Sequence, residues 1–175
     1  CRDCALCRHR RQAVVGVGDV HPDWLFIGEA PGAEEDAKGE PFVGQAGKLL
    51  DAMLRAIGLN RQNKVYIANG AKCRPEGNRT PTPEELSACR PFLARQIALL
   101  QPKIIVLLGK AAVVSVLNVE KALGAMRLKV FHSELAGDVP IVVSYHPAYL
   151  LRNLPDKAKA WEDLCFARHI LNDRP

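Results

Sequence analysis

The sequence lacks the features on which membrane and secreted proteins depend. No apolar run approaches the roughly 20 residues that cross a bilayer, and no secretory signal pattern is visible. The six cysteines therefore do not predict a disulfide framework, because disulfides persist mainly in oxidising compartments. We expect a cytoplasmic protein with no membrane partner.

Internal repeats and low-complexity tracts are also missing from the 175 residues, so we expect one domain over residues 1–175. Apolar residues make up 48% of the chain, which is enough for a sizeable core. The chain opens on Cys1 rather than methionine. We therefore expect a further N-terminal segment before it. We also expect the protein to be a monomer.

Acidic residues are fewer than basic ones, 19 against 24, which gives a net charge of +5. The basic residues are unevenly spread, with RHRR at 8–11 and Lys72, Arg74, Arg79 and Arg90 close to two cysteines. A gathered basic surface favours a polyanionic partner over scattered solvated charge. We expect that partner to be nucleic acid.

Apolar runs alternate with helical patterns along the chain. Four β-branched, apolar runs predict strands at 24–28, 64–69, 103–108 and 140–145. Periodic apolar residues and helix-start signals predict helices at 45–57, 83–100, 110–117 and 156–171. This alternation predicts an α/β protein, a three-layer α/β/α sandwich with a central four-stranded parallel sheet.

Polar side chains follow the predicted strands, at the edge where such sheets bind ligands. Glu29 comes directly after the first strand, Asn69 ends the second and His146 follows the fourth. Phe42 lies shortly after the turn that carries Glu29. Acidic groups such as Glu29 beside a flat apolar ring suit a small planar polar ligand better than a phosphate. The sequence therefore predicts a pocket for such a ligand at this edge.

Each of these residues also has a plainer structural interpretation. Asn69 can form a turn at a strand end, and His146 can be an ordinary buried histidine. Phe42 can be a core ring beneath the loop, and Glu29 can pair with a nearby arginine. We interpret the carboxylates of residues 34–36 as the solvated start of a helix, where negative charge is favourable.

The cysteines suggest a metal centre. Cys4 and Cys7 form a Cys-x-x-Cys pair, although Cys1 and Cys4 share that spacing, while Cys73 and Cys89 are dispersed. An iron–sulfur cluster needs four thiolates and tolerates dispersed ones, whereas a zinc ribbon calls for a second close pair. The residues alone leave a cluster, zinc and unligated thiols open.

Two further expectations concern the surroundings of the cysteines. Arg74 and Arg90 each follow a candidate ligand, and a cationic neighbour would stabilise a thiolate. Cys165 lies on an apolar face and is expected to be a buried structural thiol.

Four motifs in register, GEAPGAEED, PFVGQAGKLL, NGAKCRP and HPAYLLRN, resemble those of the family 4 uracil-DNA glycosylases, the iron–sulfur members of the uracil-DNA glycosylase superfamily. The resemblance extends from Cys4 to about Pro155. It implies a DNA repair enzyme that flips uracil out of single- or double-stranded DNA and hydrolyses its N-glycosidic bond. The family's α/β/α sandwich agrees with the predicted elements.

The resemblance also implies roles for individual residues. A [4Fe–4S] cluster would be bound by Cys4, Cys7, Cys73 and Cys89. Uracil would be bound by Glu29, Ala30, Phe42, Asn69 and His146, of which His146 and Glu29 are catalytic. The gap left in the duplex would be filled by Leu150, Leu151 and Arg152.

The chemistry implied is hydrolysis without strand cleavage. Negative charge develops on uracil O2, where His146 would donate a hydrogen bond, and Glu29 would hold the attacking water and face the cationic sugar. No lysine stands out as a Schiff-base nucleophile, so we expect a monofunctional enzyme. The alternatives are a catalytically weak iron–sulfur DNA-binding module of a larger protein and a zinc-stabilised domain that binds protein or RNA.

Overall fold

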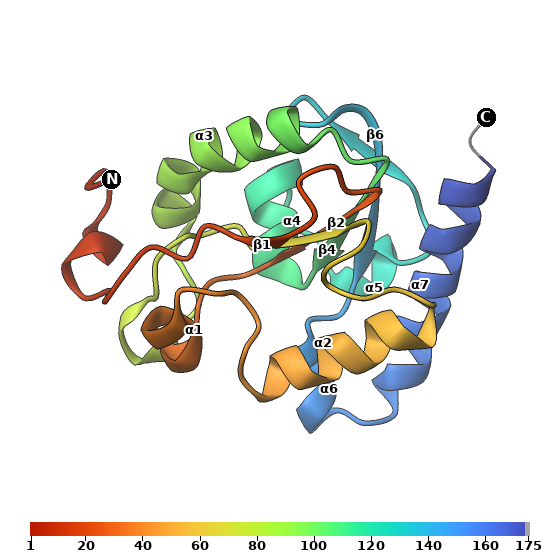
Figure 1. Cartoon of the computed structure of the whole chain (residues 1–175), viewed down its shortest axis with the longest axis horizontal. Helices are drawn as coiled ribbons and strands as arrows, with labels where there is room; N and C mark the ends of the chain where they lie inside the picture. Colours follow the sequence, from red (N-terminus) through yellow and green to blue (C-terminus); the bar gives the residue numbers. More distant parts are fainter. Residues whose placement is uncertain (174–175) are drawn as a thin grey trace.

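Four buried parallel strands form the centre of the protein, and their positions agree with the apolar runs. The computed structural model describes residues 1–173. The parallel strands are β2 (Trp24–Gly28), β3 (Val65–Asn69), β4 (Ile104–Leu108) and β6 (Gly137–Ser144), in the spatial order β3-β2-β4-β6. Both faces of these strands are covered by helices (Figure 1). The α/β sandwich and its strand positions are therefore confirmed.

The predicted number of strands is wrong, because the sheet is six-stranded and mixed. β1 (Val17–Gly18) pairs antiparallel with β3, and β5 (Phe131–Ser133) pairs antiparallel with β6. Strands of two and three residues are too short to show an apolar pattern. β1 also depends on a glycine, since a Cβ at Gly18 would lie 2.2 Å from the backbone oxygen of Val65.

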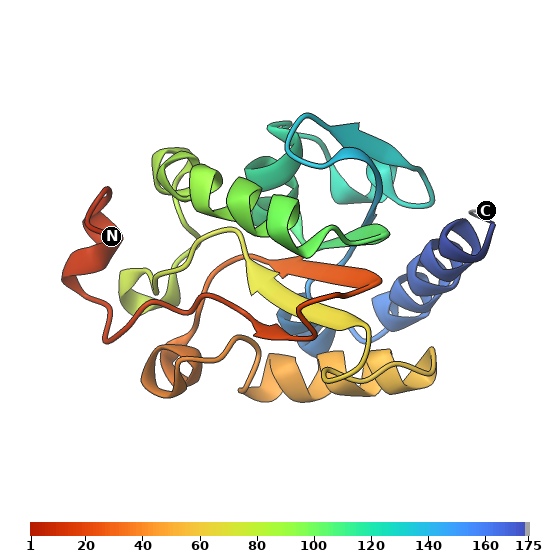
Figure 2. The ribbon, with the colours of Figure 1, turned by 45° about the horizontal axis from the view of Figure 1, so that its top comes forward.

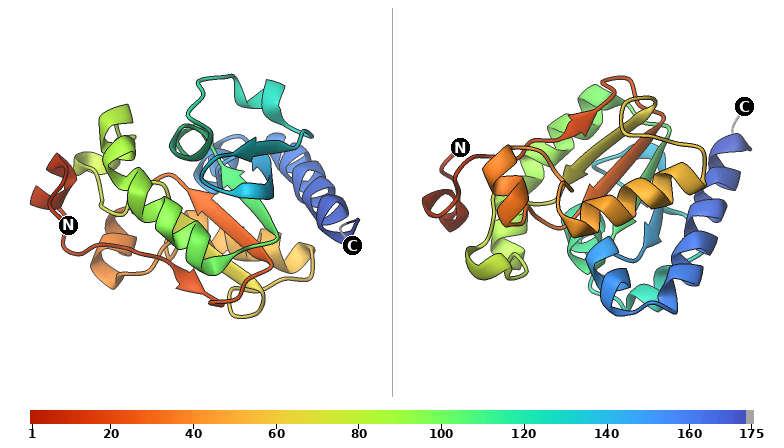
Figure 3. Two further views of the ribbon diagram at one scale, coloured as in Figure 1. Left: turned by 90° about the horizontal axis from the view of Figure 1, so that it is seen from above. Right: turned by 60° about the horizontal axis from the view of Figure 1, so that its bottom comes forward.

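Successive side chains of β2 point to opposite faces of the sheet and so belong to two different cores. Leu25 and Ile27 pack in one core with α3 (Pro83–Leu100), α4 (Lys110–Leu117) and α5 (Leu123–Met126), whereas Trp24 and Phe26 pack in the other. The second core holds α2 (Gln45–Ala56) and α7 (Asp156–Asn172). Figure 2 shows α3 and α2 on opposite sides of the sheet, and the right view of Figure 3 shows α2, α6 and α7 together on one side.

The longer helices were predicted to within one residue at each end. Thr82 caps α3 by accepting from the backbone N–H of Glu85, and Pro83 occupies the first helical position. The remaining helical elements are short: η1 (Ala5–Arg8), α1 (Ala33–Lys38), η2 (Glu76–Asn78) and α6 (Pro147–Arg152). Within residues 1–173 no helix has the length and apolarity that crossing a bilayer requires.

The buried carboxylate of Asp163 links β6 to α7. Asp163 is fully buried, accepts from Arg127 Nε at 2.9 Å and accepts from Ser144 Oγ at 2.7 Å. Because Ser144 ends β6, this network holds the strand end from which Tyr145 and His146 continue.

Candidate active site

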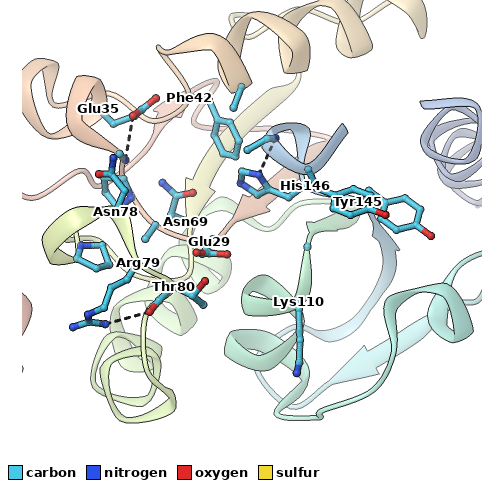
Figure 4. Close-up of a pocket in the computed structure, with 18 of the residues that line it drawn as sticks. Glu29, Glu35, Phe42, Asn69, Asn78, Arg79, Thr80, Lys110, Tyr145 and His146 are labelled. Atoms are coloured by element: carbon cyan, nitrogen blue, oxygen red, sulfur yellow. Dashed lines mark hydrogen bonds between the residues drawn. The ribbon is translucent and has the colours of Figure 1, made fainter. Parts of the chain in front are cut away.

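A cavity of about 580 Å³ opens at the carboxyl edge of the parallel strands, where sheets of this type bind ligands. All five residues expected to contact a base line it: Glu29, Ala30, Phe42, Asn69 and His146. All but Ala30 are labelled in Figure 4. These residues lie at or beyond the carboxyl ends of β2, β3 and β6. Parallel strands that are distant in sequence therefore bring them together.

Phe42 forms one wall of the cavity. Its ring is 5% exposed and stacks against His146, with centroids 5.4 Å apart and planes at 30°. A Cβ at Gly28 would lie 2.4 Å from the Phe42 ring, so only glycine lets the ring lie over the end of β2. The ring therefore belongs to the core and lines the cavity at once.

Asn69 presents an unpaired amide to the same space. In the register of the sheet it lies beside Gly28, and it is 2% exposed. Its Oδ1 is buried and, within residues 1–173, has no hydrogen-bond partner. A buried polar atom left unpaired costs about 1–3 kcal/mol, and a hydrogen-bond donor on a bound ligand would remove that cost.

His146 is held as a neutral hydrogen-bond donor. Its Nδ1 accepts from the backbone N–H of Ala148 at 3.1 Å, which places the ring proton on Nε2. Burial and, to a lesser extent, the charge of Arg152 lower the pKa of His146 to about 4, against an opposing effect of Glu35. At neutral pH the ring therefore carries no charge and Nε2–H is available to donate.

This pKa predicts a pH dependence of stability. The ordinary pKa of histidine is 6.5 and that of His146 in the folded protein is about 4, so the unfolded chain binds the proton more readily between these values. The stability contributed by neutral His146 is present above pH 6.5 and is lost as pH falls toward 4. We expect urea denaturation to show a steeper loss of unfolding free energy for wild type than for His146→Gln across this range. Parallel plots of unfolding free energy against pH for the two proteins would contradict this assignment of His146.

Glu29 lies at the centre of the cavity and is half-buried. Burial raises its pKa, and a hydrogen bond from the Thr80 hydroxyl acts in the opposite direction. Thr80 comes from the segment between Cys73 and α3, which no sequence signal connects with the first motif. The structure thus adds a positioning contact for this carboxylate.

The expectation of a solvated helix start holds for Glu34, which is exposed, but is wrong for the next two residues. The Glu35 carboxylate accepts from the backbone N–H groups of Gly32, Val43 and Gly44. Asp36 is 5% exposed and accepts from the backbone of Arg11 and Gln12. Buried carboxylates need such donors, and these tie α1 to the Phe42 loop and to the N-terminal segment.

The segment after His146 forms a short helix that was not among the predicted elements, α6 over Pro147–Arg152. Leu150 is 1% exposed, whereas Leu151 is 41% exposed and Arg152 lines the cavity. Consecutive residues of an α-helix point about 100° apart, so the two leucines lie on different faces. Leu150 is therefore a core residue here, and of the two leucines Leu151 is the one available at the surface.

The cysteines expected to hold a cluster line a second cavity, of about 320 Å³: Cys4, Cys7, Cys73 and Cys89, with Cys1 also at its wall. Cys73 and Cys89 are buried. Within residues 1–173 no three Cys, His, Asp or Glu side chains converge closely enough to hold a single metal ion. The thiols thus surround a space rather than meeting at a point.

Three cations line this thiol cavity, Arg10, Lys72 and Arg95, and none of them is one of the expected arginines. Arg10 Nη1 donates to Cys73 Sγ at 2.7 Å, and Lys72, 7% exposed, interacts electrostatically with Cys89. Arg74 instead donates to Asn78 Oδ1 at 2.7 Å. Cys165, expected to be buried, is half-buried.

The protein is of the α/β class, with a mixed sheet and a cavity at the carboxyl edge of its parallel strands. A phenyl ring, an unpaired amide oxygen and a neutral imidazole line that cavity. Comparison with known proteins agrees with this class. The family model described as the uracil DNA glycosylase superfamily matches residues 15–165.

Curated relatives narrow the assignment. A type-4 uracil-DNA glycosylase of Archaeoglobus fulgidus is 45% identical over 86% of this chain and 78% of its own length. Those of Thermotoga maritima and Pyrobaculum aerophilum are 43% and 39% identical, over 87% and 94% of this chain and 79% and 86% of their own lengths. The chain therefore belongs to the uracil DNA glycosylase superfamily and, within it, to the type-4 uracil-DNA glycosylases. The resemblance seen in the four sequence motifs is confirmed.

Proposed function

We propose that this protein hydrolyses the N-glycosidic bond of uracil in DNA and leaves an abasic site without cutting the strand. The observation that carries this function is the buried, unpaired Oδ1 of Asn69, which lines one cavity with Phe42 and His146. Uracil carries the matching groups on one edge, an N3–H donor and an O4 acceptor. The relatives' names support the same substrate.

Asn69 accounts for selectivity. Its amide offers an acceptor to uracil N3–H and a donor to O4, whereas cytosine presents the opposite pattern at these positions. In a buried site the wrong pairing leaves polar groups unsatisfied and costs about 1–3 kcal/mol for each. Phe42 stacks on the base and adds affinity with little selectivity.

His146 and Glu29 account for catalysis. Bond breaking gives an oxocarbenium-like sugar and a uracil anion, so negative charge develops on O2. The Nε2–H of a neutral His146 donates to this oxygen most strongly in the transition state. Glu29 holds the attacking water and faces the positive charge of the sugar.

The duplex contacts follow from α6. Because extruding a nucleotide costs a few kcal/mol, a side chain that fills the gap lowers that cost. The exposed Leu151 and the neighbouring Arg152 are suited to this role, with Leu150 anchoring the helix in the core.

Strand cleavage would require a lysine at the sugar. Lys110 lines the cavity, but its ammonium points away from Glu29, Asn69 and His146 (Figure 4). We therefore propose a monofunctional enzyme that acts without a Schiff base.

We also propose that Cys4, Cys7, Cys73 and Cys89 bind a [4Fe–4S] cluster. Four thiols around a shared space suit a group of several atoms better than a single ion. Within residues 1–173 no carboxylate pairs with the buried Lys72, and an anionic centre at the thiols would supply the missing countercharge. When bound, the cluster supplies a cross-link between the N-terminal segment and the segment that carries Thr80; glycosidic hydrolysis needs no electron transfer.

The cluster proposal predicts a colour and a stability effect. Protein purified without oxygen should absorb at about 400 nm, and Cys89→Ser should lose this band and unfold at lower temperature. Cys1→Ser is the matched control and should keep both properties. A colourless wild-type protein with one equivalent of zinc would contradict the proposal.

The activity is tested with a fluorescent oligonucleotide that contains one uracil. After incubation with the holoprotein, alkali should break the strand at the uracil position, and omission of alkali should leave it intact. Strands that survive alkali under every condition would defeat the enzyme and leave a DNA-binding module. Cleavage without alkali, with trapping by borohydride, would overturn the monofunctional proposal.

A further inference from the structure

Arg61 lies in the connection between α2 and β3 and grips the loop that carries Phe42. Its Nη1 donates to the backbone oxygen of Pro41 at 2.9 Å, and its Nη2 donates to the backbone oxygens of Phe42 and, at 3.4 Å, Gly47. Its Nε lies 2.5 Å from Asp51 Oδ1 on α2, in an ion pair that is mostly buried on the arginine side. One guanidinium thus joins three carbonyls to a carboxylate.

The loop needs these contacts because its backbone is strained. Phe42 has φ of +55°, a conformation that costs a residue with a large side chain about 1–3 kcal/mol. Its carbonyl is directed at the first turn of α2, where a Cβ at Gly47 would lie 1.7 Å from the oxygen. The conformation persists only if surrounding contacts determine it.

A carboxylate holds the other side of the same loop. The N–H groups of Val43 and Gly44 donate to Glu35 at 2.9 and 3.0 Å. Residues 41–44 are therefore held through their carbonyls by a cation and through their N–H groups by an anion. This arrangement leaves the Phe42 ring little freedom to turn away from His146.

We propose that Arg61 is a positioning residue, which acts through the backbone of Phe42 to set the plane on which the base stacks. This inference rests on the proposed function, since it assigns Phe42 to uracil. Arg61 does not line the cavity, so its effect on ligand binding is indirect. Lysine cannot replace it, because a single ammonium cannot span three carbonyls and a carboxylate.

Inhibition by free uracil tests this proposal without duplex binding. Stacking of a base on an aromatic ring contributes about 1–3 kcal/mol, so we expect Arg61→Lys to raise the inhibition constant of uracil roughly tenfold. Binding of uracil-free DNA should stay unchanged. Arg55→Lys, which makes the same change at an exposed arginine of α2, is the matched control and should behave as wild type does.

A double-mutant cycle separates positioning from general loss of structure. Phe42→Leu removes the ring and keeps the site filled. The increase that it causes in the inhibition constant of uracil should be smaller in Arg61→Lys than in wild type. If Arg61→Lys does not fold, as judged by its thermal unfolding, Asp51→Asn weakens the same grip and should act in the same direction. Additive effects, or unchanged inhibition by uracil, would overturn the role of Arg61. A wild-type protein that neither releases nor binds uracil would instead overturn the proposed function.

Discussion

Turnover of uracil in DNA should fall by about a hundred- to a thousandfold when His146 is replaced by alanine, with little change in DNA affinity. The Nε2–H of His146 faces charge that exists only as the bond breaks, so its loss affects the transition state more than binding. Single-turnover rates and binding to uracil-free DNA, measured on the same preparation, separate the two effects.

Two controls keep this result interpretable. His146 also caps α6 through Nδ1, and losing a cap costs about 1 kcal/mol. His146→Asn can restore a cap without reaching uracil O2, so it should be as inactive as alanine but more stable. His169→Ala removes an exposed histidine of α7 and should leave turnover intact. Equal losses of turnover and DNA binding in His146→Ala would show a structural histidine.

Asn69→Asp should change which base the protein accepts. A carboxylate at this buried position cannot donate to uracil O4 but can accept from the amino group of cytosine. Leaving buried groups unpaired at about 1–3 kcal/mol each predicts a loss of uracil excision of roughly a hundredfold. Gain of cytosine excision is the second expected outcome, and paired assays on uracil and cytosine oligonucleotides measure both.

The matched control is Asn172→Asp, which makes the same chemical change at an exposed position of α7. It should excise uracil as wild type does and ignore cytosine. If Asn69→Asp also kept wild-type rates on uracil and gained nothing on cytosine, Asn69 would have no part in reading the base.

The sheet was predictable where burial alone decides the sequence. β2 and β4 are apolar on both faces because helices cover both, and that pattern is visible without a structure. The edge strands β1 and β5 were missed because pairing, rather than side-chain burial, defines them. α6 was missed because it is only 6 residues long and follows His-Pro, a pair that is also found at the start of loops.

The candidate site divides in the same way. Glu29, Asn69 and His146 were predicted because each is a polar residue directly at the end of an apolar strand. Arg61 and Glu35 were not, because they act through backbone carbonyls and N–H groups of a loop that only the fold brings near. For the same reason Arg10, 63 positions from Cys73, could not be identified as its cationic neighbour.

A crystal structure of the protein with free uracil bound tests the grip on the base most directly. The ring should lie against Phe42, with N3–H and O4 on the Asn69 amide and O2 within hydrogen-bond distance of His146 Nε2. Uracil bound away from these three side chains, or none bound at saturating concentration, would contradict the proposed site.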